Sequence, residues 1–385
     1  MRLALQLAYK NLMGAGLRTW LNVGVLALAF LIIIFFRGFL EGWNHQAIRD
    51  SVNWDLGYGH LMHKDFDPYD PFTILDGHGI LKDPSVQHLN PILIRQATIY
   101  PEGRMLSVML KGIETNQSIL ELPTQNFGTV DEGIPAILGK NMASSIGAKE
   151  GDQILLRWRD KGGTFDAANI TVAKVFSTNA VTVDNGQIWI PIEKLWEMTG
   201  LINHATLYVA NEHYAPSEHE NWTFQTQDEL LSDFYELMEM EKISTAFMYI
   251  LLLAIALLAI FDTQVLSVFR RQKEIGTYVA LGMTRYQVVG LFTVEGTMYS
   301  FMAMVVGCIL GFPLFWFLST NGIQFPDFYQ DMGVTFPTRL FPVFSLQVVV
   351  TTILLVVISA TIVSFLPARK IARMNPVLAL KGKLQ

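Results

Sequence analysis

Four long apolar runs limit what this chain can fold into. They cover residues 21–40, 243–269, 288–318 and 345–366. A helix needs about 20 apolar residues to cross a bilayer core of roughly 30 Å, so each run is long enough. Only 16% of the residues are charged while 51% are hydrophobic, against roughly 25% charged residues in an average soluble domain. The sequence therefore predicts an α-helical membrane protein with four transmembrane helices.

The first run could instead be a cleaved signal peptide, because basic residues precede it and the small residues Ala27 and Ala29 lie inside it. However, the apolar run continues beyond Ala29 to Phe36. We therefore expect a retained transmembrane helix.

The distribution of charge predicts the orientation, because Lys and Arg concentrate in short cytoplasmic loops. Residues 1–20, 269–289 and 367–385 carry net charges of +3, +3 and +5, so the rest of this chain of net charge −6 carries −17. The sign of the net charge alternates between successive segments outside the spans, as a chain that crosses the membrane four times requires. Both termini are therefore predicted in the cytoplasm, with the long segment between the first two spans outside it.

Residues 41–242 are predicted to form a large α+β extracytoplasmic domain, because short alternating stretches there are separated by Gly, Pro, Asn and Asp. We expect strands at 57–63, 91–100, 105–110, 152–159, 169–176, 187–190 and 205–210, and helices at 138–146 and 191–198. A long helix over 227–242 should run into the second span. The remaining parts are an interfacial helix at 1–20, a cytoplasmic segment at 270–287, an extracytoplasmic loop at 319–344 and a cytoplasmic tail at 367–385.

The residues give no sign of catalysis or of a metal site. His60 and His63 are three apart in a predicted strand and so point to opposite faces, and His45, His78, His88 and His204 are scattered and expected at the surface. The single cysteine, Cys308, excludes a disulfide framework. The glycines at 133 and 139 only imitate a phosphate loop, since five residues separate them and Asn141 replaces the magnesium-binding Ser or Thr. We expect no ATPase site, cofactor or nucleic-acid partner in this chain.

Charged and small residues in the spans favour structural roles. Glu295 lies inside the third run and is expected to make a polar contact between helices. Arg37 and Asp262 lie near the ends of spans. We expect their charged groups to extend to the polar interface of the membrane. Gly307 and Gly311 have the spacing that lets helices approach closely.

The most informative segment is residues 270–285 (RRQKEIGTYVALGMTR), a basic amphipathic stretch between the second and third spans. A short helix here could dock into a groove on a soluble partner or bind anionic lipid, and the residues alone do not separate these alternatives.

The same segment resembles a signature of the permeases of the MacB/FtsX/LolC–LolE superfamily of ABC transporters. Residues 367–380, which end in NPVLAL, and residues 7–12 (LAYKNL) are similar to the terminal patterns of that family. Residues 59–63 (GHLMH) and 137–152 look like the lipoprotein-releasing branch. The resemblance covers essentially the whole chain.

The resemblance implies an inner-membrane permease of a bacterium that pairs with a second permease copy or a paralogue. It would recruit two copies of a cytoplasmic ATPase, which hold the ATP and Mg²⁺, and would meet a periplasmic lipoprotein carrier or adaptor. In the family the segment 270–287 is the coupling helix, so the expected ATPase contacts are Arg271, Lys273, Glu274, Ile275, Gly276, Ala280, Leu281, Gly282 and Met283. The candidates for contact with lipoprotein acyl chains are Phe35, Phe36, Phe39, Leu40, Met248, Leu251 and Leu252.

The leading hypothesis is extraction of lipoproteins from the membrane by mechanotransmission, in which ATPase motion is passed through the spans to the external domain. The alternatives are export of a peptide or drug with an adaptor, and an FtsX-like regulator of a periplasmic cell-wall hydrolase. A membrane-anchored enzyme would need a catalytic cluster that the external segment does not display.

Overall fold

The computed structural model describes residues 16–82, 87–130, 132–178, 180–325 and 339–373. It divides into two compact units. A helical unit comprises residues 1–43, 238–323 and 341–385, and a sheet unit comprises residues 44–237 and 324–340. The expected interfacial helix lies, up to residue 15, outside the described residues, as do most of the 319–344 loop and the end of the tail.

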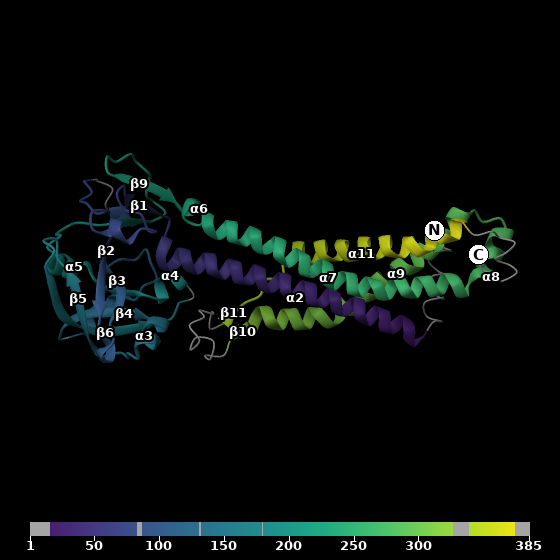
Figure 1. The fold of residues 1–385 in the computed structure, drawn as a ribbon, viewed down its shortest axis with the longest axis horizontal. Helices are drawn as coiled ribbons and strands as arrows, with labels where there is room; N and C mark the ends of the chain where they lie inside the picture. Colours follow the sequence, from purple (N-terminus) through teal and green to yellow (C-terminus); the bar gives the residue numbers. More distant parts are fainter. Residues whose placement is uncertain (1–15, 83–86, 131, 179, 326–338, 374–385) are drawn as a thin grey trace. The chain divides into compact units, whose positions relative to one another are not determined.

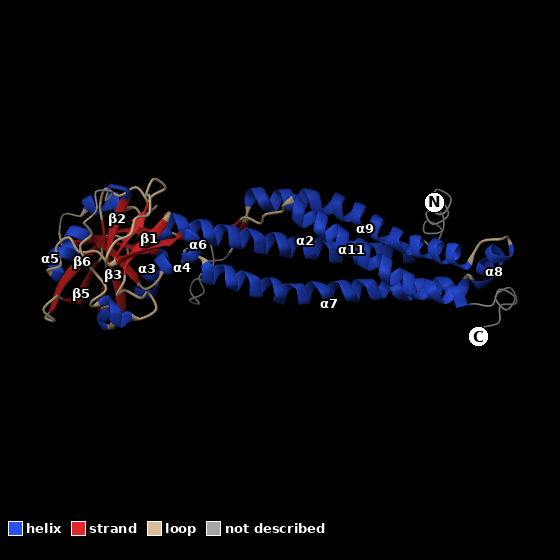
Figure 2. Cartoon of the chain, turned by 90° about the horizontal axis from the view of Figure 1, so that it is seen from above, coloured by secondary structure: helices blue, strands red, loops and turns tan. Residues whose placement is uncertain are grey.

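Long helices side by side form the helical unit (Figures 1 and 2). They are α2 (Leu17–Ser51), α7 (Ser232–Arg270), α9 (Arg285–Asn321) and α11 (Leu346–Ala368), with the short α8 (Gln272–Ala280) between α7 and α9 and the turn η6 (Arg369–Arg373) after α11. Within the described residues, four helices are long and apolar enough to cross a membrane. This confirms a membrane helical protein.

Small residues let these helices approach closely. A Cβ atom added at Gly296 of α9 would lie 2.2 Å from the Ser364 Oγ of α11, and one at Gly307 would lie 2.6 Å from the Phe30 ring of α2. A Cβ at Gly311 would meet Leu31 of α2 at 2.6 Å. The structure therefore places Gly307 and Gly311 on the face of α9 that packs against α2 of the same chain.

Six strands of the sheet unit close into a ring. Around it, β2 (Leu89–Ile99) pairs with β3 (Leu106–Ile113), which continues through β7 (Gln187–Pro191), β4 (Ile134–Gly139), β6 (Phe165–Phe176) and β5 (Gln153–Arg159) back to β2. Inward side chains from all six strands form one core with Leu110, Leu138 and Trp158 among them. Closure leaves these strands without a free edge inside the ring.

β2 also belongs to a second set of strands. Its first residues, Leu89 to Ile92, pair with β8 (Leu207–Ala210), whereas Ala97 to Ile99 pair with β5. Beyond β8 follow β1 (Gly59–His63) and β9 (Trp222–Thr226). Between Ile92 and Ala97 this side of β2 has no strand in register, so the ring and the extension separate there.

Short helices and turns complete the sheet unit. They are η1 (Val52–Leu56), η2 (Pro71–Ile74), η4 (Pro101–Gly103), η5 (Thr124–Thr129), α3 (Lys140–Ile146), α4 (Val181–Asp184), α5 (Ile192–Thr199) and α6 (Gln227–Leu230). The short strands β10 (Ile323–Gln324) and β11 (Arg339–Leu340) pair with each other.

Two expectations for residues 41–242 were wrong, and one strand was missed. Residues 138 and 139 end strand β4 instead of starting a helix, and Trp222 begins a strand that the sequence did not predict. The helix expected over 227–242 is interrupted at Leu231, because α6 ends there and α7 starts at Ser232. A capping box between Thr226 and Glu229 explains where α6 begins.

A buried carboxylate anchors α3 to α4. Asp184 accepts a hydrogen bond from the backbone N–H of Asn141, 3.0 Å away, and burial raises the pKa of Asp184 to about 6. Since the folded state then holds this proton more tightly than the unfolded state, Asp184 makes unfolding easier as the pH rises from about 4 to 6.

We predict that Asp184→Asn removes this penalty. Relative to the wild type, the variant should gain on the order of 2 kcal/mol in the free energy of unfolding between pH 4.5 and pH 7.5. Urea unfolding followed by tryptophan fluorescence at the two pH values measures the difference. An equal difference at both pH values would contradict a raised pKa.

Candidate functional site

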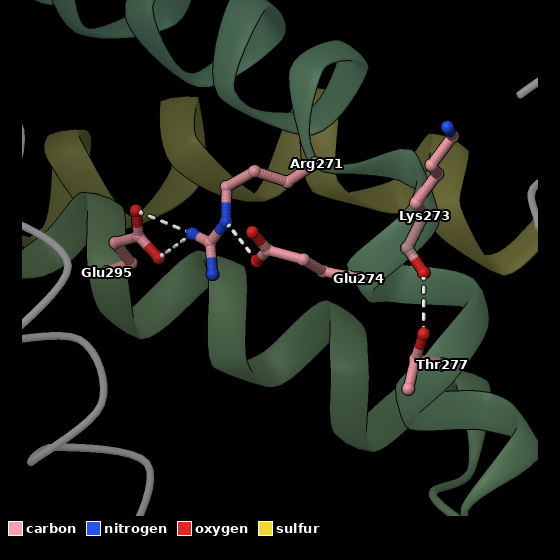
Figure 3. Close-up of polar contacts among 5 residues, drawn as sticks. All are labelled: Arg271, Lys273, Glu274, Thr277 and Glu295. Carbon is pink, nitrogen blue, oxygen red and sulfur yellow. Dashed lines mark hydrogen bonds and ion pairs between the residues drawn. The ribbon is translucent and has the colours of Figure 1, made fainter.

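Arg271 joins three helices at the α7–α8 turn. Its Nη1 donates hydrogen bonds to both carboxylate oxygens of Glu295 in α9, at 3.2 and 2.9 Å, and its Nε donates to Glu274 of α8 at 2.7 Å (Figure 3). The guanidinium carbon also lies 4.9 Å from the ring centre of Phe292. One side chain thus fixes the direction in which α8 leaves α7.

The sequence favours this geometry at the other end of α8. Gly282 adopts a φ of +99°, which ends the helix in a conformation that side chains with a Cβ disfavour. Thr284 then forms a reciprocal capping box with Gln287 and starts α9. A helix of nine residues is therefore held between two defined turns.

The two faces of α8 have different surroundings. Ile275 is buried with Val268, Val288, Phe292 and Ile371, and Gly276 is buried beside it. Lys273, Glu274, Ala280, Leu281 and Gly282 are exposed, and Leu281 is 79% exposed. The expectation that Ile275 and Gly276 contact a partner is therefore revised, because these residues hold α8 against its own unit. Met283 is half-buried at the edge of the same cluster.

The helices around this junction match a family model. Residues 246–376 match the FtsX-like permease C-terminal family. The chain therefore contains an FtsX-like permease domain. This confirms the resemblance drawn from the coupling and tail motifs.

Similarity extends beyond the permease domain. The chain is 26% identical over 340 residues to the lipoprotein-releasing system transmembrane protein LolC of Xylella fastidiosa, covering 78% of this chain and 79% of that protein. It is 22% identical over 324 residues to LolC of Neisseria meningitidis serogroup B, covering 76% and 75%. The likeness therefore includes much of the sheet unit that precedes the permease domain.

Polar side chains also bridge the long apolar helices of the helical unit. Asn22 of α2 donates to the hydroxyl of Thr263 in α7 at 2.6 Å. Arg37 of α2 donates to the hydroxyls of Thr351 and Thr352 in α11, at 2.9 and 3.0 Å. The expectation that Arg37 only reaches toward the interface missed these contacts, because they join residues more than 300 positions apart.

The acyl-chain candidates lie on α2 and α7. Phe35 contacts the rings of Phe36 and Phe39, while Leu40 is half-buried. On α7, Leu252 packs against the core of the helical unit, Met248 is half-buried and Leu251 is exposed. Both sets therefore include apolar side chains on the outside of the helical unit.

Two histidines that the sequence left apart are hydrogen-bonded. His78 Nδ1 and His204 Nδ1 are 2.9 Å apart, so they are not the separate surface residues we expected. Burial, followed by repulsion from Arg95, lowers the pKa of His78 to about 4, and burial also lowers that of His204. No group of three His, Cys, Asp or Glu in the described part of the chain could hold a metal ion. The β-bridge between Gly79 and Ala205 brings the two histidines together. No local sequence motif predicts this contact.

We predict that Arg271→Met strongly destabilises the helical unit, because it removes the guanidinium that donates to both carboxylate oxygens of Glu295, whose side chain is only 7% exposed. Loss of one partner of a buried pair costs roughly 3–5 kcal/mol. The thermal unfolding temperature of the purified chain in detergent should fall clearly, and the double variant Arg271→Met/Glu295→Leu should recover most of the loss.

A matched control is Lys194→Met, which removes an exposed ion pair to Glu197 of 2.9 Å. Such surface pairs contribute less than about 1 kcal/mol, so its unfolding temperature should hardly change. If Arg271→Met were as stable as Lys194→Met, the Arg271–Glu295 pair would not hold the junction.

Proposed function

We propose that this chain is the permease subunit of an ABC transporter that extracts lipoproteins from the inner membrane and passes them to a periplasmic carrier. The observation that supports this most is the construction of α8. One face is anchored through Arg271 and Ile275, and the other presents Lys273 and Leu281 to solvent. A helix held in this way can transmit a displacement, caused by a bound partner, to α7 and α9.

The proposal places α8 in the cytoplasm, against an ATPase subunit that supplies ATP hydrolysis. Two copies of the ATPase would serve a pair of permeases. The charge alternation along the sequence supports this orientation, since residues 269–289 carry a net charge of +3. The sheet unit would then lie in the periplasm.

The path for force would start at α8. Arg271 contacts both Glu274 in α8 and Glu295 in α9, and α9 in turn packs closely on α11 at Gly296 and on α2 at Gly307. Packed helices transmit displacement because their interfaces do not deform continuously. Movement of α8 would therefore be shared by helices of the whole helical unit, with no need for substrate to cross through a pore.

The lipoprotein part of the proposal rests on the likeness to LolC proteins over about three quarters of the chain. Acyl chains would contact the outward apolar side chains of α2 and α7, including Phe36 and Leu251. Such contacts suit acyl chains, because burial of each methylene contributes about 0.8 kcal/mol.

The substrate can be tested directly. We expect that the chain, purified with its ATPase from membranes, carries lipidated proteins and releases them when ATP and Mg²⁺ are added. Mass spectrometry of bound and released fractions measures this. The control replaces ATP with a non-hydrolysable analogue, which should leave the lipoproteins bound. Stimulation of ATP hydrolysis by a soluble peptide, without bound lipoprotein, would defeat the extraction proposal.

The partner surface can be tested separately. We expect that Lys273→Glu/Leu281→Asp abolishes co-purification of the ATPase, because both substitutions place negative charge on the exposed face of α8. Membrane insertion should be unaffected. The matched control is Lys194→Glu/Ile202→Asp, which makes the same changes at exposed residues of the sheet unit. Unchanged ATPase recovery in the α8 variant would remove α8 as the coupling helix.

A further inference from the structure

The sheet unit contains a cavity of about 410 Å³ where strand β2 passes from the ring to the extension. Loop residues around η2 form one wall, and strands β2 and β5 form the other. Three arginines line it: Arg95 from β2, and Arg157 and Arg159 from β5. We infer that this cavity binds a phosphate group through these three arginines.

The cavity exists because β2 changes partners. Residues between Ile92 and Ala97 have neither β8 nor β5 in register beside them, so the strand turns an open side toward η2. Arg95 fills part of this opening and donates through Nη1 to the backbone carbonyls of Ile74 and Leu75, at 2.8 and 3.4 Å. The guanidinium is thereby fixed at the wall of the cavity.

Arg95 holds a charge that its surroundings compensate poorly. It is only 5% exposed, and both of its hydrogen-bond acceptors are neutral carbonyl oxygens. Burial lowers the pKa of Arg95; Asp76 counteracts this shift, and repulsion from Arg159 adds to it. A buried charge is costly unless it is paired, and an anion in the cavity would add to the compensation that Asp76 gives.

The other two arginines are exposed and held in place by an aromatic ring. The guanidinium carbons of Arg157 and Arg159 lie 4.1 and 6.0 Å from the ring centre of Phe165. Arg159 Nε donates to the carbonyl of Gly163 at 3.0 Å, and Arg157 Nη1 donates to the Tyr100 hydroxyl at 3.4 Å. Arginines stacked in this way lose less side-chain freedom when they bind an anion.

Nearby carboxylates of the β5–β6 turn have local partners. Asp160 accepts from the backbone N–H of Thr164, and Asp166 from that of Ala167, both at 2.8 Å. The concentration of positive charge is unusual for this segment, because residues 44–237 contain 26 Asp and Glu but only 13 Lys and Arg. Three of those 13 line one cavity.

The chemistry favours phosphate over a carboxylate. Three guanidinium groups can offer more donors than the two oxygens of a carboxylate accept, and planar forks match phosphate oxygens well. The Gln96 amide and the Ser107 hydroxyl, which lie 3.4 Å apart, line the same cavity and can complete the set of donors. The phosphate could belong to a soluble phosphorylated compound or to a lipid headgroup.

The test is isothermal titration of the full chain in detergent with inorganic phosphate, with ionic strength matched by sodium chloride. We expect saturable binding that is weakened at least tenfold, or about 1.4 kcal/mol, in Arg157→Gln/Arg159→Gln. Both residues are exposed, so this variant should fold, and its thermal unfolding temperature checks that it does. The control Lys149→Gln/Lys194→Gln removes the same charge from exposed positions outside the cavity and should change the affinity less than twofold.

Repeating the titration in nanodiscs identifies the source of the phosphate. Weaker apparent binding in phosphatidylcholine nanodiscs than in a neutral, phosphate-free detergent assigns the cavity to a lipid headgroup, and equal binding assigns it to a soluble compound. Three results would overturn the inference: no saturable binding at about 10 mM phosphate, equal weakening in both double variants, or competition by acetate as strong as that by phosphate.

Discussion

The absence of water inside a bilayer is the constraint on which the helical unit depends. Every backbone polar group there must find its partner within the protein. Hydroxyl groups of the spans find partners locally: Thr297 and Ser364 each lie within hydrogen-bond distance of the backbone carbonyl four residues earlier. The Thr297 hydroxyl also lies 3.1 Å from the Thr361 hydroxyl of α11. Longer side chains find partners between helices, as Asn22 does with Thr263 and Arg271 with Glu295. These polar contacts thereby add to the packing of small and apolar side chains in fixing which helices are neighbours.

The sheet unit obeys a different constraint, because its strands must pair at their edges. The ring of six strands removes most edges, and β2 is the strand that makes this possible. It completes the ring with β3 and β5 and also supports β8, β1 and β9. Because β2 pairs with β8 at one end and with β5 at the other, its residues between Ile92 and Ala97 have no strand beside them on that side. Side chains and loop residues lie there instead. The arginine-lined cavity is a direct result of that geometry.

Features set by local sequence could be predicted, and features set by distant pairing could not. The four long helices and the position of α8 follow from apolar runs and from a motif of 16 residues, 270–285, so the sequence located them. The strands expected at 91–100 and 105–110 correspond to β2 and β3, because both have local apolar patterns and only a short connection lies between them. Closure of the ring could not be predicted. It depends on the parallel pairing of β4 with β6, and no pattern within either strand shows which strand is its partner. The buried face of α8 could not be predicted either. Ile275 and Leu281 are both apolar, and only the positions of α9 and η6 show that Ile275 is the buried one.

The order of the strands also affects how the chain matures. β1 is near the start of the sheet unit, yet its two neighbours, β8 and β9, lie about 150 residues later. Non-local pairings of this kind form slowly, because a long loop must close before any contact is gained. During synthesis β1 therefore has no native neighbour until β8, which ends at Ala210, has been made, and its second neighbour is complete only at Thr226. Since α7 begins only six residues further on, at Ser232, the last strand of the sheet almost directly precedes the helix that contains the second apolar run.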